Sequence, residues 1–282
     1  MTRRWLAALL LGVGMAAAVA KPQVVVVPSL DAPAAVPVLL PGRWFVADLV
    51  GDRPAVVLLH GCGSAFDAKG RLARRLTDYA AMLNAEGWHA LVLDSLTPRG
   101  EKALCTQRSG SRRVTQVQRR LDALGALQWL AAQPGVDRRR LALLGWSNGG
   151  STVLAATNRL HSEVARAAVT PRAAVAFYPG CESELARRYA STAPTLLLVG
   201  ESDDWTPAQP CRELAGIGGS GLTLVAYPGA YHGFDGTAPL RVRRDVPNGA
   251  RPGQGVTVGG DAVAREASRR ELLDFLRPLL SD

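Results

Sequence analysis

The chain has 282 residues, 48% of them hydrophobic, and a formal net charge of +9 at pH 7. This length suits one α/β domain with a substantial core. The positive charge comes from arginines scattered along the chain, without a basic stripe interleaved with aromatic residues. The composition therefore argues against nucleic acid as a partner.

The first 20 residues are typical of a cleaved secretory signal. Arg3 and Arg4 precede an apolar run over residues 5–19, and the small residues that end at Ala20 suit a signal peptidase. Two glycines interrupt the run, which is short for a membrane span of about 20 residues. We expect a signal peptide over residues 1–20, a periplasmic or secreted location, and no stable membrane insertion after cleavage. An uncleaved membrane anchor is the alternative.

Beyond residue 20, apolar runs of strand length alternate with amphipathic helices. This pattern is typical of a mostly parallel central sheet with helices on both faces, so we expect a single α/β domain over residues 21–282. The first two predicted strands are candidates for antiparallel pairing. The strands cover residues 24–27, 44–49, 55–60, 89–94, 140–144, 173–178, 195–199 and 222–227.

Helices are predicted where apolar residues recur on one helical face. They cover residues 72–83, 114–130 and 151–160, a stretch from about 207, and residues 262–276. In the helix over 114–130 an apolar stripe is expected to face the core. Arg119, Arg120 and Asp122 lie off that stripe, and we expect them on the outside.

Residues 233–260 are rich in Gly, Pro and Arg and show no periodicity. We expect them to form either a flap near the functional site or a mobile surface loop.

One glycine-rich motif resembles a dinucleotide-binding loop. Gly216-Ile-Gly-Gly-Ser-Gly221 has the required glycine spacing, but it precedes a predicted strand and does not lead into a helix. A pyrophosphate there would meet no helix N-terminus, so we interpret the motif as a turn. We expect no metal and no organic cofactor.

The sequence Gly145-Trp-Ser147-Asn-Gly149 lies between an apolar strand and a helix-forming run. A strand that turns sharply into a helix leaves its apex residue with strained dihedral angles and an exposed side chain close to the amides of the helix N-terminus. Ser147 is therefore the candidate nucleophile. A tight turn without a catalytic role is the alternative.

A nucleophilic serine needs a base and a carboxylate that orients the base. His232 follows the strand over 222–227 in a loop flanked by glycines, whereas the other three histidines adjoin strands or helices where they have structural roles. Asp203 and Asp204, in the loop after the preceding strand, compete as the acid, and Glu201 is a weaker candidate. The order Ser, Asp, His is that of α/β-hydrolases. Helix N-capping is the alternative role for either aspartate.

The negative charge on a tetrahedral intermediate also needs hydrogen-bond donors. One is expected to be the backbone amide of Asn148, and the second comes from the loop after the strand over 55–60. That loop reads His60-Gly-Cys-Gly63, so we expect the amide of Cys62 to be the second oxyanion donor.

Several separated segments resemble the dienelactone hydrolase family of α/β-hydrolases, from about Pro54 to the end of the chain. They are His60-Gly-Cys-Gly63, Asp94-Ser-Leu-Thr-Pro-Arg-Gly100, Gly145-Trp-Ser-Asn-Gly-Gly150, Gly200-Glu-Ser-Asp-Asp-Trp-Thr-Pro207 and Tyr231-His-Gly-Phe-Asp235. The resemblance implies an α/β-hydrolase fold with Ser147 as nucleophile, Asp203, four residues before Pro207, as acid, and His232 as base.

The resemblance also suggests residues that contact substrate. Arg99 falls where such enzymes place an arginine that binds a substrate carboxylate, and a structural salt bridge is its alternative role. Trp146 and Tyr231, which adjoin the nucleophile and the base, are further candidates. The enzymes that give the family its name use a cysteine nucleophile, and a second arginine after the histidine has no match here because Gly236 occupies that neighbourhood. The serine points to ordinary ester chemistry.

Four cysteines in an exported chain suggest two disulfides, with three possible pairings. The parallel topology that the resemblance implies brings the ends of neighbouring strands together. It favours the pairs Cys62 with Cys105 and Cys181 with Cys211, which would stiffen loops around the site.

These observations predict an exported serine hydrolase that cleaves a small-molecule carboxylic ester or lactone through an acyl-serine intermediate. An amidase or peptidase with the same three side chains is one alternative. A catalytically silent protein that binds an acidic polymer is another.

Overall fold

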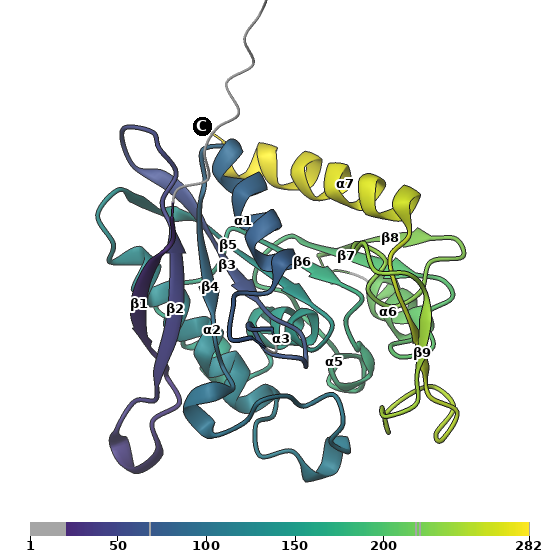
Figure 1. Ribbon diagram of the computed structural model, residues 1–282. Coiled ribbons are helices and arrows are strands. Elements are labelled where there is room, and N and C mark those ends of the chain that lie inside the picture. Colours follow the sequence, from purple (N-terminus) through teal and green to yellow (C-terminus); the bar gives the residue numbers. More distant parts are fainter. Residues whose placement is uncertain (1–20, 68, 218, 220, 282) are drawn as a thin grey trace, which may run out of the picture.

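A computed structural model describes residues 21–281, except 68, 218 and 220, as one central sheet with flanking helices (Figure 1). The predicted signal peptide lies outside the described residues. The sheet contains β1 (Gln23–Pro28), β2 (Leu39–Phe45), β3 (Arg53–Leu59), β4 (His89–Leu93), β5 (Val136–Trp146), β6 (Ala173–Phe177), β7 (Thr195–Gly200) and β8 (Leu222–Tyr227).

The helices follow the strands in alternation. They are α1 (Arg74–Ala85), α2 (Gln116–Ala131), α3 (Asn148–Thr157), α4 (Ser162–Ala165), α5 (Glu182–Ala186), α6 (Ala208–Gly216) and α7 (Ala262–Leu280), with short 3-10 turns η1 (Pro33–Ala35), η2 (Thr97–Arg99) and η3 (Ser109–Ser111). Among the helices of the described residues, none has both the length and the apolar character needed to cross a membrane.

The strand order is β1-β2-β4-β3-β5-β6-β7-β8. β1 and β2 pair antiparallel, β2 also runs antiparallel to β4, and the pairs from β4 through β8 are parallel. The predicted mostly parallel α/β sheet is thus confirmed, including its antiparallel leading strands. Because the carboxyl ends of β3, β5, β7 and β8 meet at one edge, loops that are distant in the sequence converge there.

Side chains alternate across the sheet and form a core on each face. Val57 and Leu59 of β3 pack in the cluster that contains α2, α3 and α6, whereas Val56 and Leu58 pack in the cluster that contains α1 and α7. In Figure 1, α1 and α7 lie along one side of the sheet and α2 and α3 lie along the other. The strands from β3 to β7 are therefore buried on both faces.

The expectation that α2 exposes its charged residues is wrong. Arg119 and Asp122 are fully buried and Arg120 nearly so, and each has a partner in another segment of the chain. Asp122 accepts a hydrogen bond from Ser29 Oγ, just after β1, and pairs with Arg99 of η2. Helical periodicity alone therefore does not identify the buried residues of α2.

The ends of several other helices and strands differ from the predicted ones. β2 ends at Phe45 and does not reach residue 49, α3 begins directly after Ser147, and α7 continues to Leu280. α2 begins with a reciprocal capping box, in which the Thr115 side chain accepts from Val117 N and the Gln118 side chain accepts from Thr115 N.

The segment over 233–260 contains a small antiparallel hairpin. Its strands β9 (Arg241–Arg243) and β10 (Val256–Val258) pair with each other, and Val258 also forms a bridge with His232. Asp204 anchors the hairpin, because its carboxylate accepts from Thr257 N at 2.7 Å and from Thr257 Oγ1 at 3.0 Å. The described part of the glycine-rich motif connects α6 to β8, where a turn is expected.

Candidate active site

Ser147 lies at the turn between β5 and α3, with φ of 53° and ψ of −117°. This conformation is sparsely populated for a residue with a side chain and marks a strained turn. The flanking glycines permit it. A Cβ on Gly145 would collide with the carbonyl of Gly149, and one on Gly149 would collide with the carbonyl of Leu59. The turn is further tied to β6 by the bond from Ser147 N to the carbonyl of Phe177, 2.9 Å long.

The structure brings Ser147, His232 and Asp203 into one hydrogen-bonded chain. His232 Nε2 lies 2.9 Å from Ser147 Oγ, and His232 Nδ1 lies 2.8 Å from Asp203 Oδ2. A carboxylate only accepts hydrogen bonds, so Nδ1 carries the proton and Nε2 accepts from the serine hydroxyl. His232 and Asp203 are both buried, at 4% and 5% exposure. Ser147 is thus in contact with an imidazole whose other nitrogen is bonded to a carboxylate.

Neighbouring groups hold the acid and the base in place. Asp203 Oδ1 accepts from the backbone amides of Trp205 and Thr206 at 2.8 and 2.9 Å. The Thr206 hydroxyl lies 3.0 Å from Asp203 Oδ2 and 3.1 Å from His232 Nδ1. The rings of Trp205 and Tyr178 each lie 4.6 Å from the imidazole ring of His232. These contacts leave the imidazole little freedom to rotate.

The competing acids have other partners. The Asp204 carboxylate is occupied by Thr257 on β10, and Glu201 forms an exposed ion pair with Arg212. The buried His161 pairs with Glu184, 3.1 Å away. Of the four histidines, His232 is the one that contacts Ser147.

Within the described residues, the backbone amides of Cys62 and Asn148, the two predicted oxyanion donors, are not used in hydrogen bonds of the fold. In the part of the chain that the structure describes, neither of these two backbone N–H groups has a hydrogen-bond acceptor. Both residues line a cavity beside Ser147. The disulfide from Cys62 to Cys105 ties the loop after β3 to the loop after η2, and a second disulfide joins Cys181 to Cys211. Both pairs are those that the resemblance implies.

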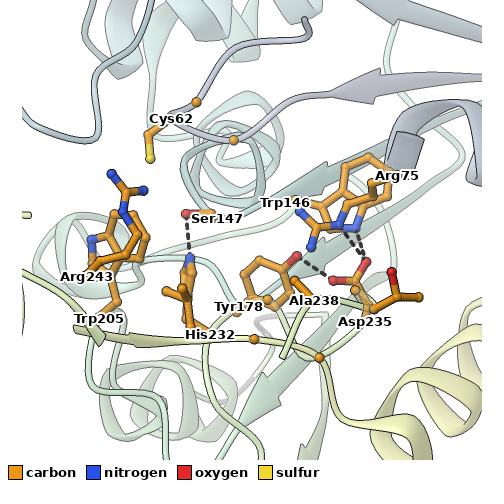
Figure 2. Close-up of a pocket in the computed structure, with 18 of the residues that line it drawn as sticks. Cys62, Arg75, Trp146, Ser147, Tyr178, Trp205, His232, Asp235, Ala238 and Arg243 are labelled. Carbon is orange, nitrogen blue, oxygen red and sulfur yellow. Dashed lines mark hydrogen bonds and ion pairs between the residues drawn. The ribbon is translucent and has the colours of Figure 1, made fainter. Parts of the chain in front are cut away.

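Two cavities meet at Ser147. The first, of about 390 Å³, is lined by the nucleophile and by Trp146, Tyr178 and the hairpin residues Arg241 and Arg243. The second, of about 670 Å³, lies toward α2, α5 and the segment 248–250 and is lined largely by polar side chains. Cys62, Ser147 and Trp205 line both. Figure 2 shows Cys62 and His232 on opposite sides of the Ser147 hydroxyl, with Arg243 stacked on Trp205.

Comparison with known proteins identifies the family. The model of the dienelactone hydrolase family matches residues 47–280. The chain belongs to the dienelactone hydrolase family. It is accordingly a hydrolase that acts on ester bonds. A search of curated proteins gives no significant match.

Solved structures share the α/β-hydrolase fold at low sequence identity. Thermogutta terrifontis esterase 2, in a structure phosphorylated by paraoxon, is 18% identical with a TM-score of 0.64, and the match covers 94% of this chain and 97% of that chain. A dienelactone hydrolase-like promiscuous phosphotriesterase from metagenomic libraries is 19% identical with a TM-score of 0.63, and the match covers 93% and 100% of the two chains.

In this dienelactone hydrolase family member, a buried cluster around Asp235 forms the floor of the first cavity. The Asp235 carboxylate accepts from Tyr178 Oη at 2.6 Å and Trp146 Nε1 at 3.0 Å, and it pairs with Arg75 at 3.1 Å (Figure 2). Burial raises the pKa of Tyr178 well above its ordinary value, so the hydroxyl remains a donor. Sequence reasoning missed this cluster, although Asp235 belongs to one of the motif segments.

The three predicted substrate-binding residues occupy different places. Trp146 lines the first cavity, whereas Tyr231 and Arg99 line neither. Arg99 donates to Asp31 at 2.7 Å, to Asp122 at 2.8 Å and to the Ser95 carbonyl at 2.7 Å. Asp122 is buried on α2 and requires a positive partner, so Arg99 takes the structural role that was its alternative.

The described residues contain no cluster of three or more His, Cys, Asp or Glu side chains arranged to hold a metal ion.

Proposed function

We propose that the protein is an exported serine hydrolase that cleaves a carboxylic ester or lactone through an acyl intermediate on Ser147. The chain of hydrogen bonds from Asp203 through His232 to Ser147, at the junction of two cavities, is the observation that supports this proposal most strongly. Cys62 and Asn148 supply backbone donors for the oxyanion. Trp146 contacts the substrate from the wall of the first cavity.

Acylation follows from the geometry. Ser147 Oγ attacks the ester carbonyl carbon while His232 Nε2 takes the hydroxyl proton, and the Asp203 carboxylate stabilises the imidazolium that forms. The carbonyl π electrons move to the oxygen, which becomes an oxyanion facing the amides of Cys62 and Asn148. When the oxyanion collapses, the bond to the leaving alcohol breaks, and His232 returns its proton to the alcohol oxygen.

Deacylation repeats the same steps with water. His232 takes a proton from a water molecule that attacks the acyl carbon, and the tetrahedral intermediate again faces the two amides. Collapse releases the carboxylic acid and returns the proton to Ser147 Oγ. Because the two cavities lie on different sides of Ser147, the acyl and alcohol parts of an open-chain ester have separate places.

Export is supported by the two disulfides, since such bonds persist in oxidising compartments. The apolar N-terminal run with its preceding arginines supports a cleaved signal. Fractionation of cells that produce the full chain, with N-terminal sequencing of the mature protein, tests both points. A chain retained intact in the cytoplasm would contradict export.

Labelling with a fluorophosphonate tests the nucleophile. Serine hydrolases form a stable phosphonyl adduct at the activated serine, and an organophosphate modifies the similar Thermogutta esterase. Peptide mapping should locate the adduct on Ser147 and not on Ser151, one turn along α3. Folded His232→Ala protein should remain unlabelled. An adduct elsewhere, or retained ester hydrolysis in Ser147→Ala, would overturn the proposal.

The leaving group is tested separately. A matched pair consisting of a chromogenic ester and the corresponding anilide distinguishes an esterase from an amidase on the same three side chains. We expect hydrolysis of the ester to be at least about 100-fold faster, because the alcohol leaves more readily than the amine. Comparable rates on both would favour an amidase or peptidase. Hydrolysis of neither would favour a silent binding protein.

A further inference from the structure

We propose that Arg119 is the positioning residue of the oxyanion hole: its guanidinium fastens together the two chain segments that carry the donor amides and places a buried positive charge behind them. This inference rests on the proposed serine-hydrolase function. It assigns a role to a side chain that lines neither cavity and contacts none of the three residues of the proton relay.

The geometry joins three segments that are far apart in the sequence. Arg119 projects from the first turn of α2, and only 1% of it is exposed. Its Nη2 donates to the carbonyl of His60, 2.7 Å away, and its Nη1 makes a short hydrogen bond to Asn148 Oδ1. The His60 carbonyl lies two residues before Cys62, and Asn148 directly follows the nucleophile. One planar group therefore sets the relative position of both donor amides.

The loop on the Cys62 side is also held by the disulfide to Cys105 and by the hydrogen bond from Leu104 N to the Cys62 carbonyl, 2.8 Å long. His60 Nδ1 lies 2.7 Å from the carbonyl of Gly61, and His60 Nε2 accepts from Ser95 N at 3.3 Å. Burial and the charge of Arg119 lower the pKa of His60, so the imidazole is neutral and adds no charge here. The guanidinium is thus the cation held against this loop.

The charge of Arg119 is not neutralised by a direct partner. Among the described residues, no carboxylate lies within ion-pair distance of its guanidinium, and its buried Nε has no hydrogen-bond acceptor. Asp122, on the next turn, is engaged by Arg99 and Ser29. Asp94 Oδ1 accepts from the amides of Leu96 and Thr97. The neighbouring Arg120, by contrast, pairs with Glu163.

A buried cation without a direct ion-pair partner is costly in the resting protein, and the more distant charges of Asp122 and Asp94 offset only part of that cost. Burial lowers the pKa of Arg119 to about 10, which still leaves it charged at neutral pH. The positive charge of Arg119 contributes to catalysis when negative charge develops nearby during the reaction. An oxyanion held by the amides of Cys62 and Asn148 supplies that charge, and preorganised positive groups in a water-poor site stabilise it strongly.

Replacement of the guanidinium tests the inference. We expect Arg119→Met to lower kcat on the order of 10- to 100-fold, because the donor amides lose both their alignment and the charge behind them. KM should change by less than about threefold, since the planar substrate carries no oxyanion. Rates are normalised to active sites titrated with the fluorophosphonate, so that unfolded protein does not count.

A boronic acid provides the readout that a purely structural role would not move. Ser147 Oγ forms a bond to boron and the hydroxyl proton passes to His232, which leaves a tetrahedral anion in the oxyanion position. The dissociation constant of the boronic acid should rise in Arg119→Met by the same factor as kcat falls. The dissociation constant of the neutral product alcohol should change by less than about threefold.

Further variants separate contact from fold. Arg119→Lys keeps the charge with a different shape and should lose about three- to tenfold in kcat and in boronic acid affinity, so it decides the matter if the Met variant does not fold. Removal of the acceptor in Asn148→Ala should be non-additive with Arg119→Met. Arg140→Met is the matched control, because Arg140 binds Asp137 and the Leu280 carbonyl at the other end of β5. It should reduce stability without changing kcat.

The outcomes distinguish the inference from the function on which it rests. Folded Arg119→Met and Arg119→Lys with kcat and boronic acid affinity within twofold of the parent would overturn the role of Arg119 while the serine mechanism stands. Full hydrolysis by Ser147→Ala would instead remove the serine mechanism itself.

Discussion

The groups on the two sides of Ser147 differ in kind: side chains lie on one side and backbone amides on the other. On one side, His232 and Asp203, on the loops after β8 and β7, form the hydrogen-bonded chain that we propose as a proton relay. On the other side are the backbone amides of Cys62 and Asn148, which we propose as oxyanion donors; the disulfide at Cys62 and the hydrogen bonds of Arg119 hold the segments that carry them. The relay depends on which residues are present. The amide side depends on where the backbone is held.

This difference predicts how each side responds to substitution. A relay loses most of its effect when one member changes its chemistry, because the proton has no other route. Backbone donors survive every change of their own side chain except replacement by proline, so other substitutions affect them indirectly, through the contacts that hold the loop. The following experiments, in order of expected effect, test this division.

The largest effect is expected on the relay side. Asp203→Asn keeps the shape of the side chain but removes the carboxylate that orients His232, and we expect kcat to fall by about 10⁴-fold. Asp204→Asn is the matched control. Asp204 binds Thr257 on the hairpin and is outside the relay, so its kcat should fall less than about tenfold. Equal losses in the two variants would break the distinction between relay and scaffold.

The two disulfides allow a test of the amide side, because removal of either one should destabilise the protein by a similar amount. They close loops of similar length, with sequence separations of 43 and 30, so replacing either pair by alanines should reduce the free energy of unfolding by roughly 4 kcal/mol. Only the pair Cys62 and Cys105 holds a donor loop directly. At a temperature where both variants are folded, its loss should lower kcat/KM about tenfold, and loss of Cys181 and Cys211 less than threefold.

Urea unfolding and kinetics on the same preparations separate the two contributions. A similar fall in kcat/KM for both disulfide variants would mean that activity follows overall stability. The amide side would then have no special dependence on its loop.

Substitution of Thr206 is a finer test of the relay side. The Thr206 hydroxyl lies 3.1 Å from His232 Nδ1, 3.0 Å from Asp203 Oδ2 and 3.0 Å from the Tyr178 carbonyl. Because Nδ1 carries a proton, the hydroxyl has one proton to share between the carboxylate and the carbonyl. Thr206→Val should lower kcat about tenfold with little change in KM, since one hydrogen bond to the relay contributes about 1.4 kcal/mol. Thr206→Ser keeps the hydroxyl and should restore most of the activity. Failure of serine to restore it would assign the effect to packing.

The smallest effect concerns pH and the loop at His60. Burial, and then the charge of Arg119, hold the pKa of His60 well below 6.5 in the folded protein. Below that pH the unfolded chain binds a proton that the folded protein does not. Stability should therefore fall as the pH drops below about 6.5, by up to about 1.4 kcal/mol per pH unit from this group.

Urea unfolding at pH 7, 6 and 5 measures this dependence. His60→Gln should show a shallower fall in stability than the parent. Some slope should remain, because burial also lowers the pKa of His89. Identical slopes in parent and variant would show that His60 is not held neutral by its surroundings.

The relay side was also the side that the sequence indicated best. The order of the motifs, and the rule that parallel strands end at one edge, indicated Ser147, His232 and an aspartate in the loop after the strand over 195–199. The choice of Asp203 over Asp204, and the two cysteine pairs, came from the resemblance to the family. These features depend on short motifs and apolar runs, which can be recognised locally in the sequence.

The amide side was much harder to predict. Arg119 lies off the apolar stripe of its helix, so periodicity placed it on the surface, and only the packing of distant segments over α2 buries it. The resemblance suggested that Arg99 binds substrate, with a structural salt bridge as its alternative role. The sequence could not decide between them, because it does not show that Asp122 is buried and needs a positive partner. The hairpin over 241–258 carries no periodic signal, since each of its strands has three residues.

The hairpin of β9 and β10 adjoins His232 and also lines both cavities. It follows the last member of the relay and returns to it, through the bridge from Val258 to His232 and the bond from Gly259 N to the His232 carbonyl. Between those attachments it contributes Arg241 and Arg243 to one cavity and residues 248–250 to the other. Because this hairpin lines both cavities, we expect that exchange of this one segment would change substrate preference while Ser147, His232 and Asp203 stay in place.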